Sequence, residues 1–269
     1  MPEGHTIHRL ARDHKPLLVG KAPCVSSPQG RFAGGAAILD GRVVRRVEPY
    51  GKHLWYHFGS AGEMGLLLHV HLGLYGNWTS GVLPAPEPRG ALRVRLATDE
   101  HWLDLRGPTT CDVVTPAERK AVLARLGPDP LRTDADGGRA FDCISRSRST
   151  IGQLLMDQKV LAGIGNVYRA EALYRASLSP FRQGRDVGED VWAGVWQDLR
   201  RLLRGGVRAN RIVTTEAADR GRRTGRARRE DAHYVYRRQG LPCRRCGTLV
   251  RTEVMAGRNL FWCPACQRG

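Results

Sequence analysis

The chain has 269 residues, with 43 Lys and Arg against 26 Asp and Glu, a formal net charge of +17 and a pI near 10.4. It is long enough for one large or two medium domains, and it has neither an apolar run near the roughly 18 residues of a membrane helix nor the apolar core of a signal peptide. We therefore expect a cytoplasmic, nucleoid-associated protein with no membrane partner, whose charge excess favours nucleic acid over an acidic membrane surface.

The predicted elements begin with a short helix directly after Pro2 and Glu3. Its apolar face is traced by Ile7, Leu10, Ala11 and Leu18, and Gly20 can end it. From about residue 38 to 105 the hydrophobic period changes to two. The alternating segments are 42–50, 52–58, 65–72, 91–99 and 101–105. The sequence thus predicts an antiparallel β-sandwich, preceded by a helix, over residues 1–115.

Helical periodicity returns at Thr115, which can act as an N-cap ahead of Pro116. Two helices are predicted over 149–160 and 166–177, on either side of "LAGIGN", and a longer one over 189–206. The stretch 211–232 contains "RGRRTGRARRED" and almost no apolar residue, which predicts a mobile basic loop. We expect a helical domain over 116–232 and a separate tail over 233–269.

The tail carries two C-x2-C pairs separated by sixteen residues, namely Cys243, Cys246, Cys263 and Cys266. Such pairs can hold one tetrahedral zinc ion, with a β-hairpin between them, so we predict a structural zinc ribbon. An odd total of seven cysteines argues against a disulfide framework. "AGRN" predicts the hairpin tip, where Arg258 is placed to reach a phosphate; an exposed arginine that only aids solubility is the alternative.

A second candidate phosphate site is the turn formed by Gly163 and Gly165, just ahead of a helix beginning near Asn166. Glycine lets a backbone approach a ligand closely, and the N–H groups of a helix start favour an anion. Asn166 can both cap this helix and donate to a phosphate, while Lys159 adds charge from the preceding helix. Together with Arg258, the turn predicts a two-point clamp on a nucleic-acid backbone.

The first residues have two interpretations. Pro2 can simply start a helix, because proline presets the backbone there. Alternatively, removal of Met1 leaves Pro2 with a secondary amine, and an α-amino group with a pKa of about 7.7–8.0 is partly neutral and nucleophilic at physiological pH. Such an amine can attack a sugar C1′ if a proton donor lies beside it. Glu3 is adjacent, and burial would favour its protonated form.

In this setting "MPEGHT", "YGKHLW", "LGPDPL", "LMDQKVLAGIGNVYRAEAL" and "LPCRRCG…GRNLFWCPACQ" resemble the formamidopyrimidine-DNA glycosylase / endonuclease VIII family, in order over nearly the whole chain. The resemblance implies an α+β fold, with an N-terminal β-sandwich, a helix-two-turn-helix domain and a C-terminal zinc-ribbon hairpin. It also implies a monomeric DNA glycosylase and AP lyase of base excision repair, acting on duplex DNA that contains a damaged base or an abasic site. The residue roles that it implies are a Schiff-base nucleophile (Pro2), a general acid (Glu3) and phosphate contacts (Lys52, Asn166 and Arg258).

By the same resemblance, "HLGLYG" aligns with the loop that fills the space vacated by a flipped nucleotide. Leu74 and Tyr75 are the candidate wedge; the alternative is that both are core residues of a turn. Gly73 stands where the endonuclease VIII branch often has a glutamine, which departs from the usual three-residue plug. Arg106 is expected either to reach the opposite strand or only to pair with Asp104.

The two branches of this family differ in the class of damaged base that they release. The purine-specific branch usually carries an Arg-Phe pair where this chain has Gly107 and Pro108, while "HLGLYG" and "GNVYRAE" look more like the endonuclease VIII branch. We therefore predict release of oxidised pyrimidines followed by β,δ-elimination, with oxidised purines as the alternative. The rival from another class is a zinc-ribbon DNA-binding protein without catalysis, which would not need Pro2 or Glu3.

Overall fold

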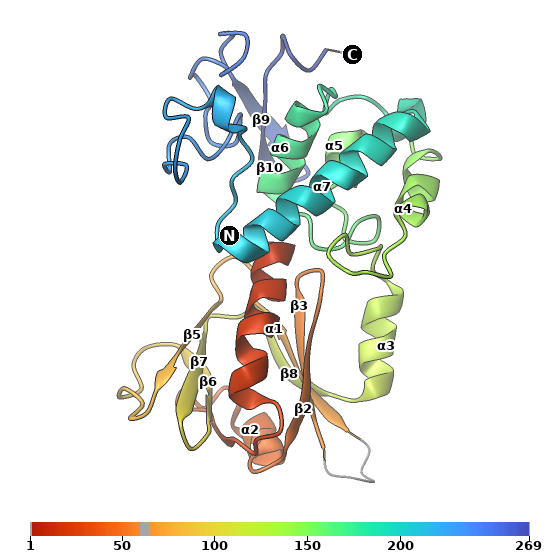
Figure 1. Cartoon of the computed structure of the whole chain (residues 1–269). Coiled ribbons are helices and arrows are strands. Elements are labelled where there is room, and N and C mark those ends of the chain that lie inside the picture. The colour runs from red at the N-terminus through yellow and green to blue at the C-terminus, as the bar shows by residue number, and fades with distance from the viewer. Residues whose placement is uncertain (1, 60–64, 269) are drawn as a thin grey trace. The chain divides into compact units, whose positions relative to one another are not determined.

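Two four-stranded antiparallel sheets form a sandwich in the first of two units, Met1–Arg125, and the second unit spans Leu126–Gly269 (Figure 1). The structure, a computed structural model, describes residues 2–59 and 65–268. Within these ranges, no helix combines the length and apolar character needed to cross a membrane. The predicted sandwich, helical domain and zinc-finger hairpin are all present, so the predicted fold class is confirmed.

The first sheet has the order β1-β6-β7-β5, formed by Cys24–Ser26, Leu92–Ala97, His101–Arg106 and Asn77–Val82. The second has the order β2-β3-β4-β8, formed by Val44–Tyr50, His53–Phe58, Leu66–His71 and Thr110–Val114. Alternate residues of both sheets point into one core, as Leu54 and Tyr56 of β3 and Leu103 and Leu105 of β7 illustrate. β5 and β8 were not predicted. In β5, the strand buries only Trp78, so the alternation of apolar and polar residues is weak.

Helix α1 (Gly4–Leu18) was predicted correctly and covers the sandwich with Ile7, Ala11 and Leu18, all part of the same core. Its buried His14 hydrogen-bonds through Nδ1 to Tyr56 Oη, 2.7 Å away. The following strand β1 and helix α2 (Ala33–Leu39) escaped prediction. α2 is short and carries two glycines, which weaken a helical signal.

Helix α3 (Pro116–Ala124) begins where Thr115 and Pro116 predicted a helix start. Thr115 Oγ1 accepts from Glu118 N at 3.3 Å, and Thr115 N donates to Glu118 Oε2 at 2.7 Å, which completes a capping box. The Arg119 guanidinium lies over the Trp55 ring at 5.8 Å and donates to Glu48 at 2.6 Å. These contacts fasten α3 to the face of the second sheet that points away from the sandwich core.

The second unit contains α4 (Gly137–Ile144), α5 (Ile151–Leu154), α6 (Asn166–Arg175) and α7 (Glu189–Ala209), together with two 3₁₀ turns, η1 (Gly184–Asp186) and η2 (Ala217–Asp219). The predicted helix over 149–160 is wrong in length, because α5 stops at Leu154. Beyond it the chain continues in turns: Asp157 Oδ1 accepts from Lys159 N, and the Gln158 amide donates to two backbone carbonyls. α4 was not predicted.

The tail contains β9 (Arg251–Met255) and β10 (Arg258–Trp262), which pair antiparallel around a tip at Ala256 and Gly257. Both tip residues have positive φ, 51° and 68°, as a tight two-residue hairpin requires. The predicted hairpin and its tip are confirmed. The apolar side of this segment shares one core with α6. That core includes Val167, Ala170 and Tyr174 of α6 together with Tyr234, Val235 and Phe261.

Candidate active site and nucleic-acid interface

The start of the chain places Glu3 at the N-cap of α1, directly after Pro2. Its backbone carbonyl accepts from Thr6 N at 2.9 Å and from Ile7 N at 3.4 Å, so the first helical turn fixes its position. Glu3 is 0% exposed, whereas Pro2 is half-buried. His5 is also buried, and burial together with the positive chain terminus lowers its pKa to about 4, so its imidazole is neutral at neutral pH. Met1 lies outside the described residues.

Lys52 lies in the turn between β2 and β3, beside a cluster of three histidines. His53 and His71 are cross-strand partners, and His53 Nδ1 lies 2.8 Å from His69 Nε2. Burial, with added repulsion from neighbouring positive groups that include Lys52, lowers the pKa of His53 to about 3. Burial and the Lys52 charge also lower the pKa of His71. At neutral pH this end of the sheet thus presents one ammonium group among neutral imidazoles.

The turn after β4 carries the candidate wedge. Tyr75 is 88% exposed and Leu74 is 40% exposed, so neither is a core residue of the turn. Gly73 has φ 65°, and a Cβ there would lie 1.9 Å from Thr109 Oγ1. A longer side chain is therefore excluded at Gly73 without rearrangement, which gives a physical reason for the missing glutamine. The candidate wedge therefore offers two adjacent side chains, Leu74 and Tyr75.

Arg106 ends β7 and is held by the buried carboxylate of Asp104. Its Nη2 donates to Asp104 Oδ2 at 3.0 Å, and Arg95 Nε donates to Asp104 Oδ1 at 2.7 Å. The pairing with Asp104 that we expected as one option is therefore present. The turn that follows is short, with Gly107 at φ 59°, and a Cβ there would lie 3.5 Å from the carbonyl oxygen of Tyr75. The two turns after β4 and β7 accordingly lie next to each other.

The "LAGIGN" turn is built around the Gln158 side chain. Its Oε1 accepts from Gly163 N at 3.0 Å, and its Nε2 donates to Ile164 O at 2.9 Å. Gly163 has φ 91°. The prediction that Asn166 caps the following helix is wrong, because Gly165 is the N-cap and Asn166 is the first residue of α6. Lys159 is exposed, but it lies in the turn after α5 and not in a helix.

Asn166 is buried and connected to the hairpin by hydrogen bonds. Its Nδ2 donates to Asn259 O at 2.9 Å, and its Oδ1 accepts from Arg169. Arg169 is 0% exposed and also lies within 3.4 Å of Asn259 O and Met255 O, one on each strand of the hairpin. Arg258, which precedes Asn259, is exposed at the start of β10. The structure thus brings the two predicted phosphate-binding residues of this unit into one connected element.

The four tail cysteines form the cluster that their spacing predicted. Their sulfur atoms all lie within 4.8 Å of one another, with 3.9 Å between Cys243 and Cys266 and 3.4 Å between Cys246 and Cys263. Thiolates around a tetrahedral zinc ion at about 2.3 Å would stand about 3.8 Å apart, so this donor set fits one structural zinc. Tyr174 Oη lies 3.1 Å from Cys243 Sγ and links the metal site to α6.

The predicted residues fall in two sets. Pro2, Glu3, Lys52, Leu74, Tyr75 and Arg106 belong to the first unit; Lys159, Asn166, Arg258 and the four cysteines belong to the second. Sequence reasoning missed the histidines beside Lys52, and it missed Gln158 and Arg169, which shape the Asn166 site. The spacing of Arg169 three residues after Asn166 on one helix was the available signal.

Three family descriptions match the chain in order. Residues 1–111 match the formamidopyrimidine-DNA glycosylase N-terminal domain, residues 126–217 the formamidopyrimidine-DNA glycosylase H2TH domain, and residues 240–269 the zinc finger found in FPG and IleRS. Together these descriptions cover most of the chain, including the start of α1, the Asn166 turn and the four cysteines.

Relatives match over the full length. Endonuclease 8 1 of Mycobacterium tuberculosis is 48% identical over 272 residues, which cover 99% of this chain and 100% of the relative. Formamidopyrimidine-DNA glycosylase of Thermus thermophilus is 32% identical over 271 residues, or 99% and 98% of the two chains. The fold also resembles that of the Lactococcus lactis Fpg in complex with DNA containing an abasic site. That likeness has a TM-score of 0.82 at 19% identity and covers 99% and 100% of the two chains.

Proposed function

The chain belongs to the family of formamidopyrimidine-DNA glycosylases and endonucleases VIII, DNA glycosylases with AP lyase activity in base excision repair, and on this premise we propose that it releases oxidised pyrimidines from duplex DNA through a Schiff base on Pro2. The observation that carries the proposal is the burial of Glu3 at the N-cap of α1, one residue from Pro2. A carboxyl removed from water favours its protonated form, which a general acid needs.

In the proposed reaction, the Pro2 nitrogen bonds to C1′ of the damaged nucleotide while the bond between C1′ and the base breaks, and the base leaves with the proton that the Pro2 nitrogen gives up. Glu3 delivers the proton that allows the sugar ring to open, and an iminium forms between Pro2 and C1′. The iminium acidifies the neighbouring C2′–H. Loss of that proton expels the 3′ phosphate by β-elimination, and a second elimination expels the 5′ phosphate, which leaves a one-nucleotide gap.

The damaged nucleotide must leave the helix stack for this chemistry, at a cost of a few kcal/mol that is smallest for a damaged base. We assign Lys52, Asn166 and Arg258 to phosphates flanking that nucleotide, and Leu74 and Tyr75 to the vacated space. The strong exposure of Tyr75 supports the wedge role. Lys159 and Arg106 complete the proposed DNA surface. Arg106 is paired with Asp104 in this structure. We further propose that residues 1–115 carry catalysis, 116–232 duplex binding and 233–269 the zinc-stapled hairpin.

Borohydride trapping on a duplex with an abasic site tests the nucleophile. We expect a covalent adduct with the wild type and none with Pro2→Gly, and mass spectrometry of the active protein should find Met1 removed. An adduct of equal yield in Pro2→Gly, or an active chain that retains Met1, would defeat the proposal. A non-catalytic DNA-binding protein would bind the duplex and form no adduct.

The lesion class needs its own experiment. The short turn with Gly107 and Pro108, in place of an Arg-Phe pair, supports the pyrimidine branch, and so does the identity to Endonuclease 8 1. The identity to the Thermus thermophilus formamidopyrimidine-DNA glycosylase keeps oxidised purines as the second candidate. Duplexes that each carry one known lesion should show faster release of oxidised pyrimidines; faster release of oxidised purines would reverse the assignment.

A further inference from the structure

The stretch that the sequence predicted as a mobile basic loop has a closed base in the structure. We use the name arginine loop for residues 215–231. Thr214 N donates to Ala232 O at 2.9 Å, and Thr215 Oγ1 donates to Asp231 O at 2.6 Å, so the two ends of the loop meet. η2 forms one short turn within it. A loop whose ends are hydrogen-bonded to each other is a compact surface feature and not an extended linker.

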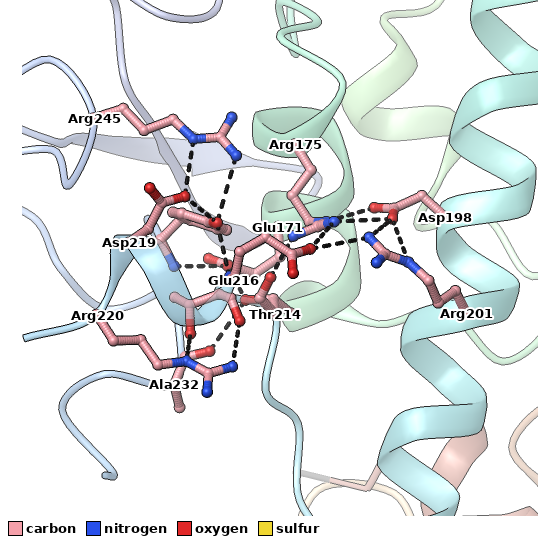
Figure 2. A network of polar contacts seen from close by, with 12 residues as sticks. Glu171, Arg175, Asp198, Arg201, Thr214, Glu216, Asp219, Arg220, Ala232 and Arg245 are labelled. Carbon is pink, nitrogen blue, oxygen red and sulfur yellow. Dashed lines mark hydrogen bonds and ion pairs between the residues drawn. The ribbon is translucent and has the colours of Figure 1, made fainter. Parts of the chain in front are cut away.

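Glu171 of α6 holds the base of the loop by hydrogen bonds to residues on both sides of it. The carboxylate is 0% exposed and accepts hydrogen bonds from four donors. One donor is Thr214 Oγ1, before the loop (Figure 2). The other three are the backbone N–H groups of Tyr234, Val235 and Tyr236 after the loop, each at 2.8 Å. A buried carboxylate is stable only when such donors satisfy it. Glu171 therefore ties both ends of the arginine loop to one rigid helix.

Three of the loop's four acidic residues pair at its base with arginines from outside the loop, and the fourth, Glu230, lies 3.8 Å from Arg228 of the loop itself. Glu216 accepts from Arg175 at 2.8 Å and from Arg201 at 3.2 Å, and Asp219 accepts from Arg245 at 3.2 Å (Figure 2). Asp231 pairs with Arg244 at 3.1 Å. All of these arginines lie outside the arginine loop. Among the described residues, none of these three carboxylates forms an ion pair with an arginine of the loop.

The outer part of the loop is a concentration of positive charge. Residues 220–229 contain six arginines and no acidic residue. Four of them, Arg222, Arg223, Arg226 and Arg229, are exposed, and across the described ranges none of the four has an ion-pair partner. Burial, with the positive charges of Arg226 and Arg220, lowers the pKa of Arg211, whose side chain donates to Ala227 O at 2.6 Å. The fold thus holds like charges together at a cost that an anionic ligand would relieve.

We propose that the arginine loop is a pre-formed site for the phosphodiester backbone of duplex DNA, and that it contributes binding that does not depend on a lesion. Guanidinium groups suit this ligand because they bind phosphate oxygens in a planar, bidentate manner. The loop acts in addition to Asn166 and Arg258 and serves the search over undamaged DNA. The inference rests on the proposed function only for its biological setting, because the binding itself requires no chemistry at Pro2.

The decisive measurement is the salt dependence of binding to an undamaged duplex. The variant R222Q/R223Q/R226Q/R229Q should bind about tenfold more weakly or worse in 0.1 M salt, with a slope of log K against log salt reduced by about two to four. The matched control is R139Q/R146Q/R148Q/R204Q, which removes the same charge from exposed positions of the same unit outside the loop. Equal slopes for the two variants would overturn the proposal and leave only a general charge effect.

Two further measurements distinguish a failure of the proposed function from a failure of the proposal for the arginine loop. Borohydride trapping at saturating enzyme and low salt should give the same adduct yield in the loop variant as in the wild type. If neither protein forms an adduct, the result counts against the proposed function and not against DNA binding by the arginine loop. Limited trypsin digestion tests whether the loop is pre-formed: we expect slow cleavage after the loop arginines in the wild type and at least tenfold faster cleavage in Glu171→Gln. Rapid cleavage in the wild type would refute a pre-formed site.

Discussion

The side-chain amide of Asn166 donates a hydrogen bond of 2.9 Å to the backbone carbonyl of Asn259, the residue that follows Arg258. The first residue of α6 and the second residue of β10 are therefore joined, and Arg169 adds contacts to both hairpin strands. A phosphate held by Arg258 would be positioned relative to Asn166 by these bonds and not by the flexibility of a hairpin alone.

Arg258→Ala should weaken duplex binding and reduce the slope of log K against log salt by about one, because one phosphate contact is lost. The measurement is a fluorescence-anisotropy titration at several salt concentrations. Arg251→Ala, an exposed arginine of β9 in the same hairpin, is the control and should keep the wild-type slope. A wild-type slope in Arg258→Ala would show that the hairpin tip does not touch phosphate.

Cys263→Ser should lose stoichiometric zinc, since the remaining three sulfur atoms cannot complete the tetrahedral site. Because Cys263 is buried in the core shared with α6, loss of the metal should also lower the thermal transition of the second unit. Metal analysis and calorimetry measure both effects. Cys143→Ser, at an exposed cysteine of α4 outside the cluster, should retain one zinc ion; unchanged zinc in Cys263→Ser would contradict the assigned ligand set.

Glu3→Gln should reduce single-turnover base release by a factor of about a hundred or more, the usual contribution of a general acid, while leaving duplex affinity close to that of the wild type. The substitution keeps the shape of a fully buried side chain and removes its transferable proton. Glu87→Gln, at an exposed position of the same unit, should have no effect. Base release at the wild-type rate in Glu3→Gln would remove this residue from the mechanism.

The buried histidines predict how stability responds to acid. Burial lowers the pKa of His14 to about 4 and that of His53 to about 3. The folded state therefore keeps these groups neutral where the unfolded chain protonates them, and the free energy of unfolding should fall as pH drops below about 6.5. The loss reaches at most about 2 kcal/mol per histidine at pH 5.

Urea denaturation at pH 7 and pH 5, followed by a probe of the first unit, measures this dependence. His14→Gln should flatten it, although the variant loses stability at pH 7 because the bond to Tyr56 changes. His8→Gln, at a half-exposed position of α1, provides the comparison. An identical pH dependence in His14→Gln and the wild type would show that His14 does not titrate on unfolding.

Those parts of the fold that depend on local chemistry could be predicted from sequence. Thr115 and Glu118 specify the start of α3, and the cysteine spacing specifies the metal site and its hairpin. The parts that depend on contacts between distant residues could not. α5 ends early because Gln158 bonds to the "LAGIGN" turn, and nothing in the helical period of 149–160 reveals that competition. Arg169 looked like an ordinary helix residue until its contacts with the hairpin 86 and 90 residues away were known.

The common core of α6 and the tail also bears on engineering. Val167, Ala170 and Tyr174 pack against residues that flank the cysteines, and Tyr174 reaches Cys243 itself. An excised tail would expose that apolar side to water, and a chimera that imports the tail of another protein would have to import the matching face of α6 as well. A transplant of the second unit, residues 126–269, would keep the hairpin together with that face of α6.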